Sequence, residues 1–273
     1  MRTRPHLSRF LPLLGGVAVL MLSLGGVGAG GCSSVPGTER TQLRLLPEAQ
    51  ELSMGAQAYQ EILKDKTIET GTERAQMVER VGQRLAAVAG KNYAWEFKLV
   101  QDDKTVNAFC LPGGKIAIYT GILPYTQNED GLAAVMGHEI AHALARHGAE
   151  RVSQQVLTES ALTIVSAGLG QASPVVAGPV MAALGVGTEV GIMLPYSRLH
   201  EHEADSIGLR LMVRAGYNPH EAVRLWERMA KMPGERPPEM LSTHPEPEAR
   251  ARRIAEQIPT VLAEERRAAP SGG

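Results

Sequence analysis

The stretch AAVMGHEIAHALARH, residues 133–147, contains the pattern H-E-x-x-H as His138, Glu139 and His142. Its apolar flanks and the lack of a helix breaker predict a helix over 129–147. Histidines four residues apart lie on one face of a helix, about 5 Å apart, so both imidazoles can bind one metal ion. Glu139 follows about 100° round the helix, where its carboxylate can deprotonate a water that the metal activates. The pattern therefore predicts two ligands and the general base of a catalytic zinc site.

A catalytic zinc site needs a third protein ligand. His147 lies five residues after His142, whereas the metzincin pattern places its third histidine six residues on and requires a glycine where Ala145 stands. On a continuous helix His147 also lies about 500° round from His142, away from the ligand face. We therefore expect His147 to be a surface residue or a residue that supports a ligand.

The third ligand is sought downstream, in YSRLHEHEADSIG (196–208). Glu201 and Asp205 are four residues apart, so on a helix both carboxylates face one way. One can bind the metal while the other accepts the N–H of a ligating imidazole. Glu203 is a rival ligand that projects about 200° away from Glu201, and His200 and His202 are further candidates. Spacing alone also fits a solvated acidic helix start.

The remaining pattern predicts a predominantly helical α+β protein. Alternating or apolar runs at 95–101 and 114–123 predict strands of a small sheet with at least one hairpin. Helical spacing predicts further helices over 47–66, 72–90, 202–216, 220–232 and 248–258. We expect one domain over 47–262 and a disordered tail over 263–273.

The segment 161–195 carries a single charge, Glu189, but its glycines and prolines divide it into short apolar pieces. We expect helical pieces that cover the site or touch a membrane surface, and a true membrane span is the alternative.

The N-terminus predicts export. Residues 1–31 hold three arginines and no acidic residue, and an apolar run ends in AGGC. This resembles a lipoprotein signal peptide in which Cys32 is lipidated, although Ala29 stands where such boxes usually have leucine. A retained membrane anchor is the alternative reading. The polar stretch 32–46 is expected to be a tether, and Ser33 after the cysteine favours the outer membrane by resemblance to lipoprotein sorting.

Composition excludes other classes of protein. The chain has 273 residues, of which 44% are hydrophobic and 21% charged, so it can bury a core. A formal net charge of −1 without a basic stripe gives no sign of nucleic-acid binding. Two cysteines, of which Cys32 is expected to carry lipid, leave no disulfide framework.

Three motifs add a family resemblance. S-R-x-x-E-x-x-A-D spans residues 197–205, NAFCLPGGKIAIYTGIL spans 107–123, and STHPEPEAR spans 242–250. With H-E-x-x-H they resemble metallopeptidase family forty-eight, the gluzincin group of HtpX, BepA and LoiP, over residues 45–258. The lipobox and the lack of a repeat array make LoiP-like periplasmic lipoproteins the most similar members.

The resemblance implies a zincin fold of helices around a small mixed sheet, with one Zn²⁺ per chain. It implies Glu201 as third zinc ligand, Asp205 as the carboxylate that supports the site, and Glu139 as general base. It also implies that His244 lies near the zinc and occupies the water position in a resting state, whereas the motif alone also fits an exposed turn. Arg250 is expected to stabilise oxyanion charge or to pair with Asp205 or Glu201.

These observations predict a zinc endopeptidase anchored through Cys32 to the bacterial envelope and facing the periplasm. Its expected substrates are misfolded or unassembled envelope proteins that pair with an edge strand near 114–120, and its expected partners include outer-membrane assembly machinery. The alternative is a chaperone-like assembly factor for outer-membrane proteins that uses the protease fold mainly for binding.

Overall fold

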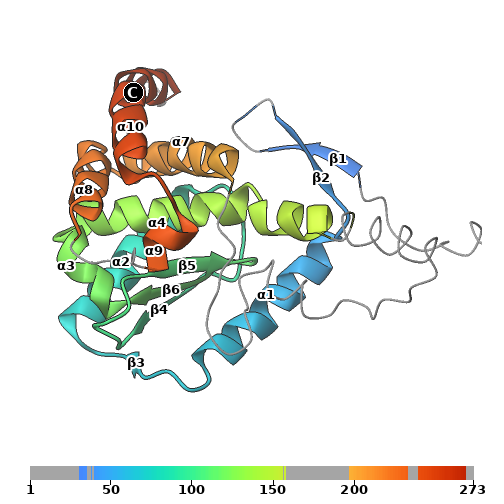
Figure 1. Cartoon of the computed structure of the whole chain (residues 1–273), viewed down its shortest axis with the longest axis horizontal. Helices are drawn as coiled ribbons and strands as arrows, with labels where there is room; N and C mark the ends of the chain where they lie inside the picture. The colour runs from blue at the N-terminus through green and yellow to red at the C-terminus, as the bar shows by residue number, and fades with distance from the viewer. Residues whose placement is uncertain are drawn as a thin grey trace, which may run out of the picture.

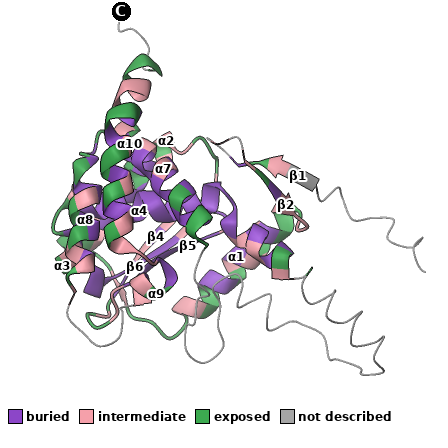
Figure 2. Ribbon diagram, turned by 45° about the horizontal axis from the view of Figure 1, so that its top comes forward, coloured by how far each residue is buried: buried purple, intermediate pink, exposed green. Residues whose placement is uncertain are grey.

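The helix that carries H-E-x-x-H runs through the centre of the molecule (Figure 1). The structure is a computed structural model that describes residues 31–35, 38, 40–155, 157, 197–232 and 239–268. Helix α4 (Glu129–Leu144) begins at Asn128, whose side chain accepts a hydrogen bond from the Gly131 N–H at 2.8 Å. Every residue from Gly131 to Leu144 is buried (Figure 2), so α4 forms the axis of the core.

A four-stranded mixed sheet lies on one side of α4, in the order β3-β4-β6-β5 (Figure 1). Its strands are β3 (Ile68–Glu69), β4 (Glu96–Val100), β5 (Ala108–Leu111) and β6 (Lys115–Tyr119). β4 and β6 are parallel, with Phe97 opposite Ile116, and the other pairs are antiparallel. β6 is therefore an inner strand with both edges paired, and the expectation of a free edge near 114–120 is wrong.

β5 carries the free edge instead, because within the described chain it pairs with β6 alone. It was not recognised in the sequence because all four of its residues are buried and show no alternation. β5 packs against α4, which places the sheet edge beside the H-E-x-x-H helix.

Helices cover both the sheet and α4. They are α1 (Glu48–Leu63), α2 (Glu73–Val88), the 3-10 turn η1 (Thr120–Ile122), α3 (Leu123–Thr126), α7 (Arg198–Arg214), α8 (His220–Ala230), α9 (Glu239–Thr243) and α10 (Pro247–Ala268). α7 packs along α4 on the side away from the sheet (Figure 1). α8 also packs against α4, and α10 packs against α7 and α8. The prediction of a predominantly helical α+β fold with a small mixed sheet is confirmed.

Helix α10 is longer than its motif predicts. It continues through Pro259 to Ala268, into the stretch expected to be a disordered tail. Ile254, Ile258 and Val261 are buried at helical spacing, and this apolar stripe packs α10 onto the domain.

The stretch expected to be a tether is a docked hairpin. β1 (Gly31–Ser34) pairs with β2 (Thr41–Arg44) in a separate two-stranded sheet beside the C-terminal end of α4 (Figure 1). Val35 is buried, and the Gln42 side-chain amide donates to the Ala145 carbonyl at 2.8 Å. These long-range contacts leave no local signal in a polar sequence.

Among the described residues, none of the helices combines the length and apolar character that crossing a bilayer requires. The segment 161–195, for which helical pieces or a span were expected, lies outside the described residues.

Candidate metal centre

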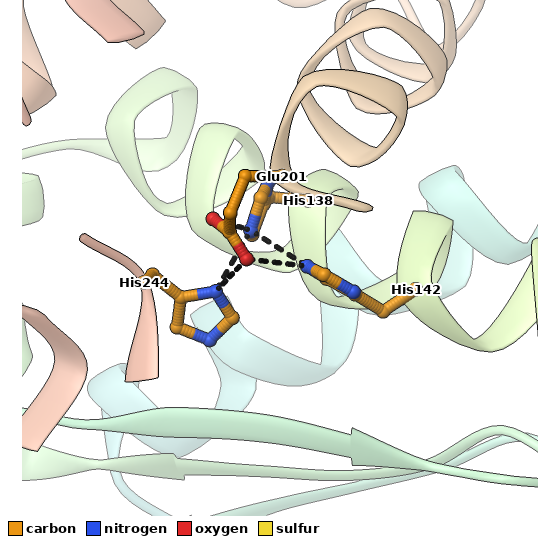
Figure 3. A group of neighbouring side chains, drawn as sticks. All are labelled: His138, His142, Glu201 and His244. Carbon is orange, nitrogen blue, oxygen red and sulfur yellow. Dashed lines mark hydrogen bonds and ion pairs between the residues drawn. The ribbon is translucent and has the colours of Figure 1, made fainter. Parts of the chain in front are cut away.

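Four buried side chains from three parts of the chain point their donor atoms at one another (Figure 3). His138 and His142 come from α4, Glu201 from the first turns of α7, and His244 follows α9 directly. Their ligand atoms all lie within 4.8 Å of one another. The structure thus brings the two histidines of the motif together with Glu201 and His244.

The distances between these donors fit one metal ion. His138 Nε2 lies 3.0 Å from His142 Nε2 and 3.1 Å from His244 Nδ1. Glu201 oxygens lie 3.4 Å from His138 Nε2, 3.4 Å from His142 Nε2 and 2.9 Å from His244 Nδ1. Metal bonds of about 2.05 Å in a tetrahedron place its ligand atoms about 3.3 Å apart. The four donors therefore form a tetrahedral cage of nitrogen and oxygen ligands.

The charges around the cage call for a divalent cation. Glu139, Glu201 and Asp205 are each less than 5% exposed, and Arg250 is fully buried. Three carboxylates against one guanidinium leave a formal charge of −2, which one divalent cation would neutralise. A buried charge left without compensation costs several kcal/mol, so the residues present fit a bound metal.

Asp205 and Arg250 contact the side chains of two of the donors, His138 and Glu201. Asp205 Oδ1 lies 3.1 Å from His138 Nδ1, the ring nitrogen that faces away from His142. Arg250 pairs with Asp205 and, at 2.8 Å, with Glu201, and its guanidinium stacks 3.5 Å from the centre of the Trp226 ring. Burial alone would raise the pKa of Asp205, but the Arg250 charge and the hydrogen bonds from His138 and Arg250 together lower that pKa. Arg250 therefore contributes to keeping both carboxylates ionised.

His147 contacts a ligand directly, because the helix does not continue as the sequence predicts. α4 ends at Leu144, Arg146 takes a left-handed backbone (φ 55°), and a second helix covers 147–155. The break returns His147 to His142, where the two Nδ1 atoms lie 2.9 Å apart. His147 is fully buried, so the surface alternative is wrong.

Glu139 lies beside the cage, against His244. Its Oε1 atom is buried without a hydrogen-bond partner among the described residues, and His244 Nε2 is 3.4 Å away. Burial raises the pKa of this carboxyl, and a raised pKa favours a group that must gain and lose a proton near neutral pH.

The rival ligands of the acidic segment lie elsewhere. Glu203 pairs with His147 at 3.1 Å and with Arg40 at 2.7 Å, His200 pairs with Glu150 at 3.1 Å, and His202 is exposed. Arg40 and Glu150 were not among the expected site residues, and their sequence surroundings carry no motif that would have identified them.

Comparison with known proteins gives the family of the chain. The sequence profile of peptidase family M48 matches residues 72–258, most of the domain expected over 47–262. The chain belongs to peptidase family M48. This confirms the predicted class of enzyme, a metallopeptidase, at the level of the family.

Members of the M48 family with similar sequences come from mitochondria and bacteria. Mitochondrial metalloendopeptidase OMA1 of Schizosaccharomyces pombe is 40% identical over 215 residues, which cover 77% of this chain and 61% of that protein. OMA1 of Saccharomyces cerevisiae is 31% identical over 258 residues, covering 84% and 72%. The β-barrel assembly-enhancing protease of Escherichia coli is 30% identical over 218 residues, covering 77% and 44%. The chain thus spans less than two thirds of the fission-yeast and E. coli proteins.

The expected location is wrong. A periplasm-facing protein anchored to the outer membrane of a bacterial envelope was predicted, but the relatives at 40%, 31% and 32% identity are mitochondrial metalloendopeptidases. A basic segment without acidic residues, such as 1–31, is common to bacterial signals and mitochondrial targeting segments, so it does not distinguish them. The similarity also extends to OMA1 and BepA and does not single out LoiP-like members. Lipidation of Cys32 stays a prediction.

Proposed function

We propose that this M48 protein is a zinc-dependent endopeptidase with Glu139 as its general base. The observation that carries the proposal is the tetrahedral cage of three imidazoles and one carboxylate, beside which a Glu139 oxygen makes no hydrogen bond within the described residues. His138, His142 and Glu201 would hold the ion, because nitrogen and carboxylate donors in this geometry suit Zn²⁺. Bound zinc supplies Lewis acidity, which polarises the scissile carbonyl and acidifies a water.

The chain's own residues divide the remaining work. Glu139 takes the proton of the attacking water on its carboxylate and passes it to the leaving amine. Asp205 orients His138 through Nδ1, so that Nε2 faces the ion. Arg250 is occupied by two carboxylates and a tryptophan ring, and we assign it to holding Glu201 and Asp205 in place.

His244 closes the site in the structure. It supplies a fourth donor, whereas a catalytic zinc site keeps one position for water or substrate. We propose that His244 holds a resting state and withdraws when substrate binds.

The proposed substrate is an extended stretch of polypeptide that adds to the free edge of β5. This strand lies against α4, and its residues Cys110 and Leu111 line one small cavity with His142. Pairing along the backbone reads an extended shape with little regard for side chains, which suits misfolded or unassembled proteins. The name of the E. coli relative links that protein to β-barrel assembly, and for this chain we propose unfolded polypeptide as substrate.

The Glu139→Gln variant tests the proposal on an unfolded protein substrate. Loss of a general base lowers the cleavage rate by about 10²–10⁴-fold, while zinc content stays at the wild-type level because the cage is intact. Glu129→Gln is the matched control, since Glu129 lies on the same helix and pairs with Arg80 at the surface. Equal cleavage by wild type and Glu139→Gln would refute the mechanism and favour a chaperone-like binding role.

Zinc content tests the third ligand separately. Glu201→Ala removes one donor of the cage, so we expect zinc to be lost in dialysis that wild type withstands. Unchanged occupancy would show that Glu201 is not a ligand.

A further inference from the structure

Arg40 connects the N-terminal hairpin to the wall of the metal centre. It lies just before β2, and its Nη atoms donate to both Glu150 oxygens, at 2.7 and 2.8 Å. Its Nε donates to Glu203 Oε1 at 2.7 Å. The Arg40 side chain is 20% exposed and the two glutamates 7% and 6%, so both pairs are largely shielded from water.

A chain of hydrogen bonds leads from Arg40 to a metal-facing nitrogen. Glu203 Oε2 lies 3.1 Å from His147 Nε2, and a carboxylate can only accept, so His147 donates through Nε2. With its proton on Nε2, His147 accepts at Nδ1, where His142 Nδ1 lies 2.9 Å away and donates. With its proton on Nδ1, His142 presents the lone pair of Nε2 to the cage.

The geometry of these contacts sets their direction. Arg40 Nε donates to Glu203 Oε1 at 2.7 Å, which leaves Glu203 Oε2 to accept from His147 Nε2 at 3.1 Å. The Arg40 guanidinium can only donate hydrogen bonds. It therefore sets the donor and acceptor roles at the end of this hydrogen-bond series that is farthest from the metal position.

We propose that Arg40 is a positioning residue of the metal centre, which sets the ring orientation and tautomer of His142 through Glu203 and His147. The hairpin that carries it (residues 31–44) is thereby part of the active site, although it lies outside the residues matched by the family profile. The inference rests on the proposed zinc site. Partners of this kind, one step removed from the ligand, change metal affinity by about 10–100-fold when they are lost.

The alternative is that Arg40 only fastens the hairpin to the domain. Gln42 separates the two roles, because it fastens the same hairpin through the Ala145 carbonyl and is not part of the Arg40–Glu203–His147 chain. Gln42→Ala is therefore the matched control for Arg40→Ala. Arg74→Ala is a second control, since Arg74 makes a similar two-bond pair with Glu69 at a distant exposed position.

The experiment measures zinc retention by the full-length chain against a competing chelator, alongside the melting temperature of the zinc-free protein. We expect Arg40→Ala to weaken zinc binding at least tenfold, and both control variants to bind zinc within twofold of wild type. Wild-type affinity in Arg40→Ala, or an equal loss in Gln42→Ala, would overturn the proposal. If wild type itself binds no zinc, the proposed function fails, and this result is distinct from either outcome.

Two further variants show whether the effect passes along the chain. Glu203→Gln keeps the shape of the side chain but adds an amide donor, so we expect it to weaken zinc binding as Arg40→Ala does, and it serves if Arg40→Ala does not fold. In a His147→Phe background, Arg40→Ala should cause no further loss, because the link to His142 is already broken. Additive losses would show that Arg40 acts by another route and would refute the proposal.

Discussion

His244 is the residue whose position decides whether the site is open. It completes the cage at 2.9 Å from Glu201 and 3.1 Å from His138, and we propose that it takes the place of a substrate carbonyl or water. If the site is open in only a small fraction of the molecules, the apparent affinity for substrate falls in proportion to that fraction. The closed arrangement therefore predicts a low basal activity.

His244→Ala removes the donor that competes with substrate. We expect kcat/KM on an unfolded substrate to rise about tenfold or more when zinc is saturating, because His138, His142 and Glu201 still hold the ion. His220→Ala, at an exposed position at the start of α8, is the control. A fall in kcat/KM would instead assign His244 to transition-state stabilisation.

His147 shows where the prediction of side-chain positions from helical spacing fails. The pairs His138 and His142, and Glu201 and Asp205, follow from positions four residues apart on a helix, and Glu139 from its place directly after His138; the structure brings all five together. The angle calculated for His147 assumed an unbroken helix, but Arg146 adopts φ 55° and the helix restarts. A left-handed arginine has no sequence signature, so the contact with His142 could not be predicted.

At the scale of elements, the site depends on a close crossing of α4 and α7. Gly137 and Gly208 face each other there, and a Cβ added at Gly208 would lie 3.0 Å from the backbone of Gly137 and His138. Glycine at both positions lets the two helices cross closely, and this crossing brings residues from both to the candidate metal site.

Gly208→Ala tests how closely α4 and α7 pack, because two opposing effects predict opposite changes in the free energy of unfolding. Helix propensity alone would stabilise the protein by about 1 kcal/mol, whereas overpacking against the α4 backbone costs about 1–3 kcal/mol. We expect net destabilisation in urea unfolding of the zinc-free protein, with weaker zinc binding as α7 moves away. Ser206→Ala, two residues earlier on α7, is the control for propensity. A more stable Gly208→Ala protein would show that the crossing has room to spare.

The elements that could be predicted from the sequence are stabilised by a local pattern of buried residues. Those that could not are stabilised by contacts with distant parts of the chain. Helices with an apolar stripe, such as α2 and α8, were predictable because their burial pattern is local. β5 was missed because it is buried on both faces, and the hairpin at 31–44 because partners more than 100 residues away hold it. Pairing at such separation is not encoded in any short window of sequence.

At the scale of the whole molecule, the candidate metal centre brings together residues that lie far apart in the sequence. Glu201 lies 59 positions after His142, and His244 and Arg250 come from the C-terminal part of the domain. All of them are buried, so their charges must be balanced inside the fold and not by solvent. Metal binding and folding are therefore expected to be coupled.

Removal of the metal tests this coupling. Without a cation, three buried carboxylates, those of Glu139, Glu201 and Asp205, outnumber the one buried arginine that pairs with them among the described residues, so the native state loses stability while the unfolded chain does not. Free zinc at about one hundred times its dissociation constant adds about 2.7 kcal/mol to the free energy of unfolding. We expect calorimetry to show a melting temperature that rises with zinc and falls with a chelator, whereas magnesium has no effect because imidazole donors suit it poorly. Glu201→Ala should lose most of the zinc-dependent shift. An identical melting temperature with zinc and with chelator would mean that the cage does not bind the ion, because a ligand that binds only the native state must stabilise it.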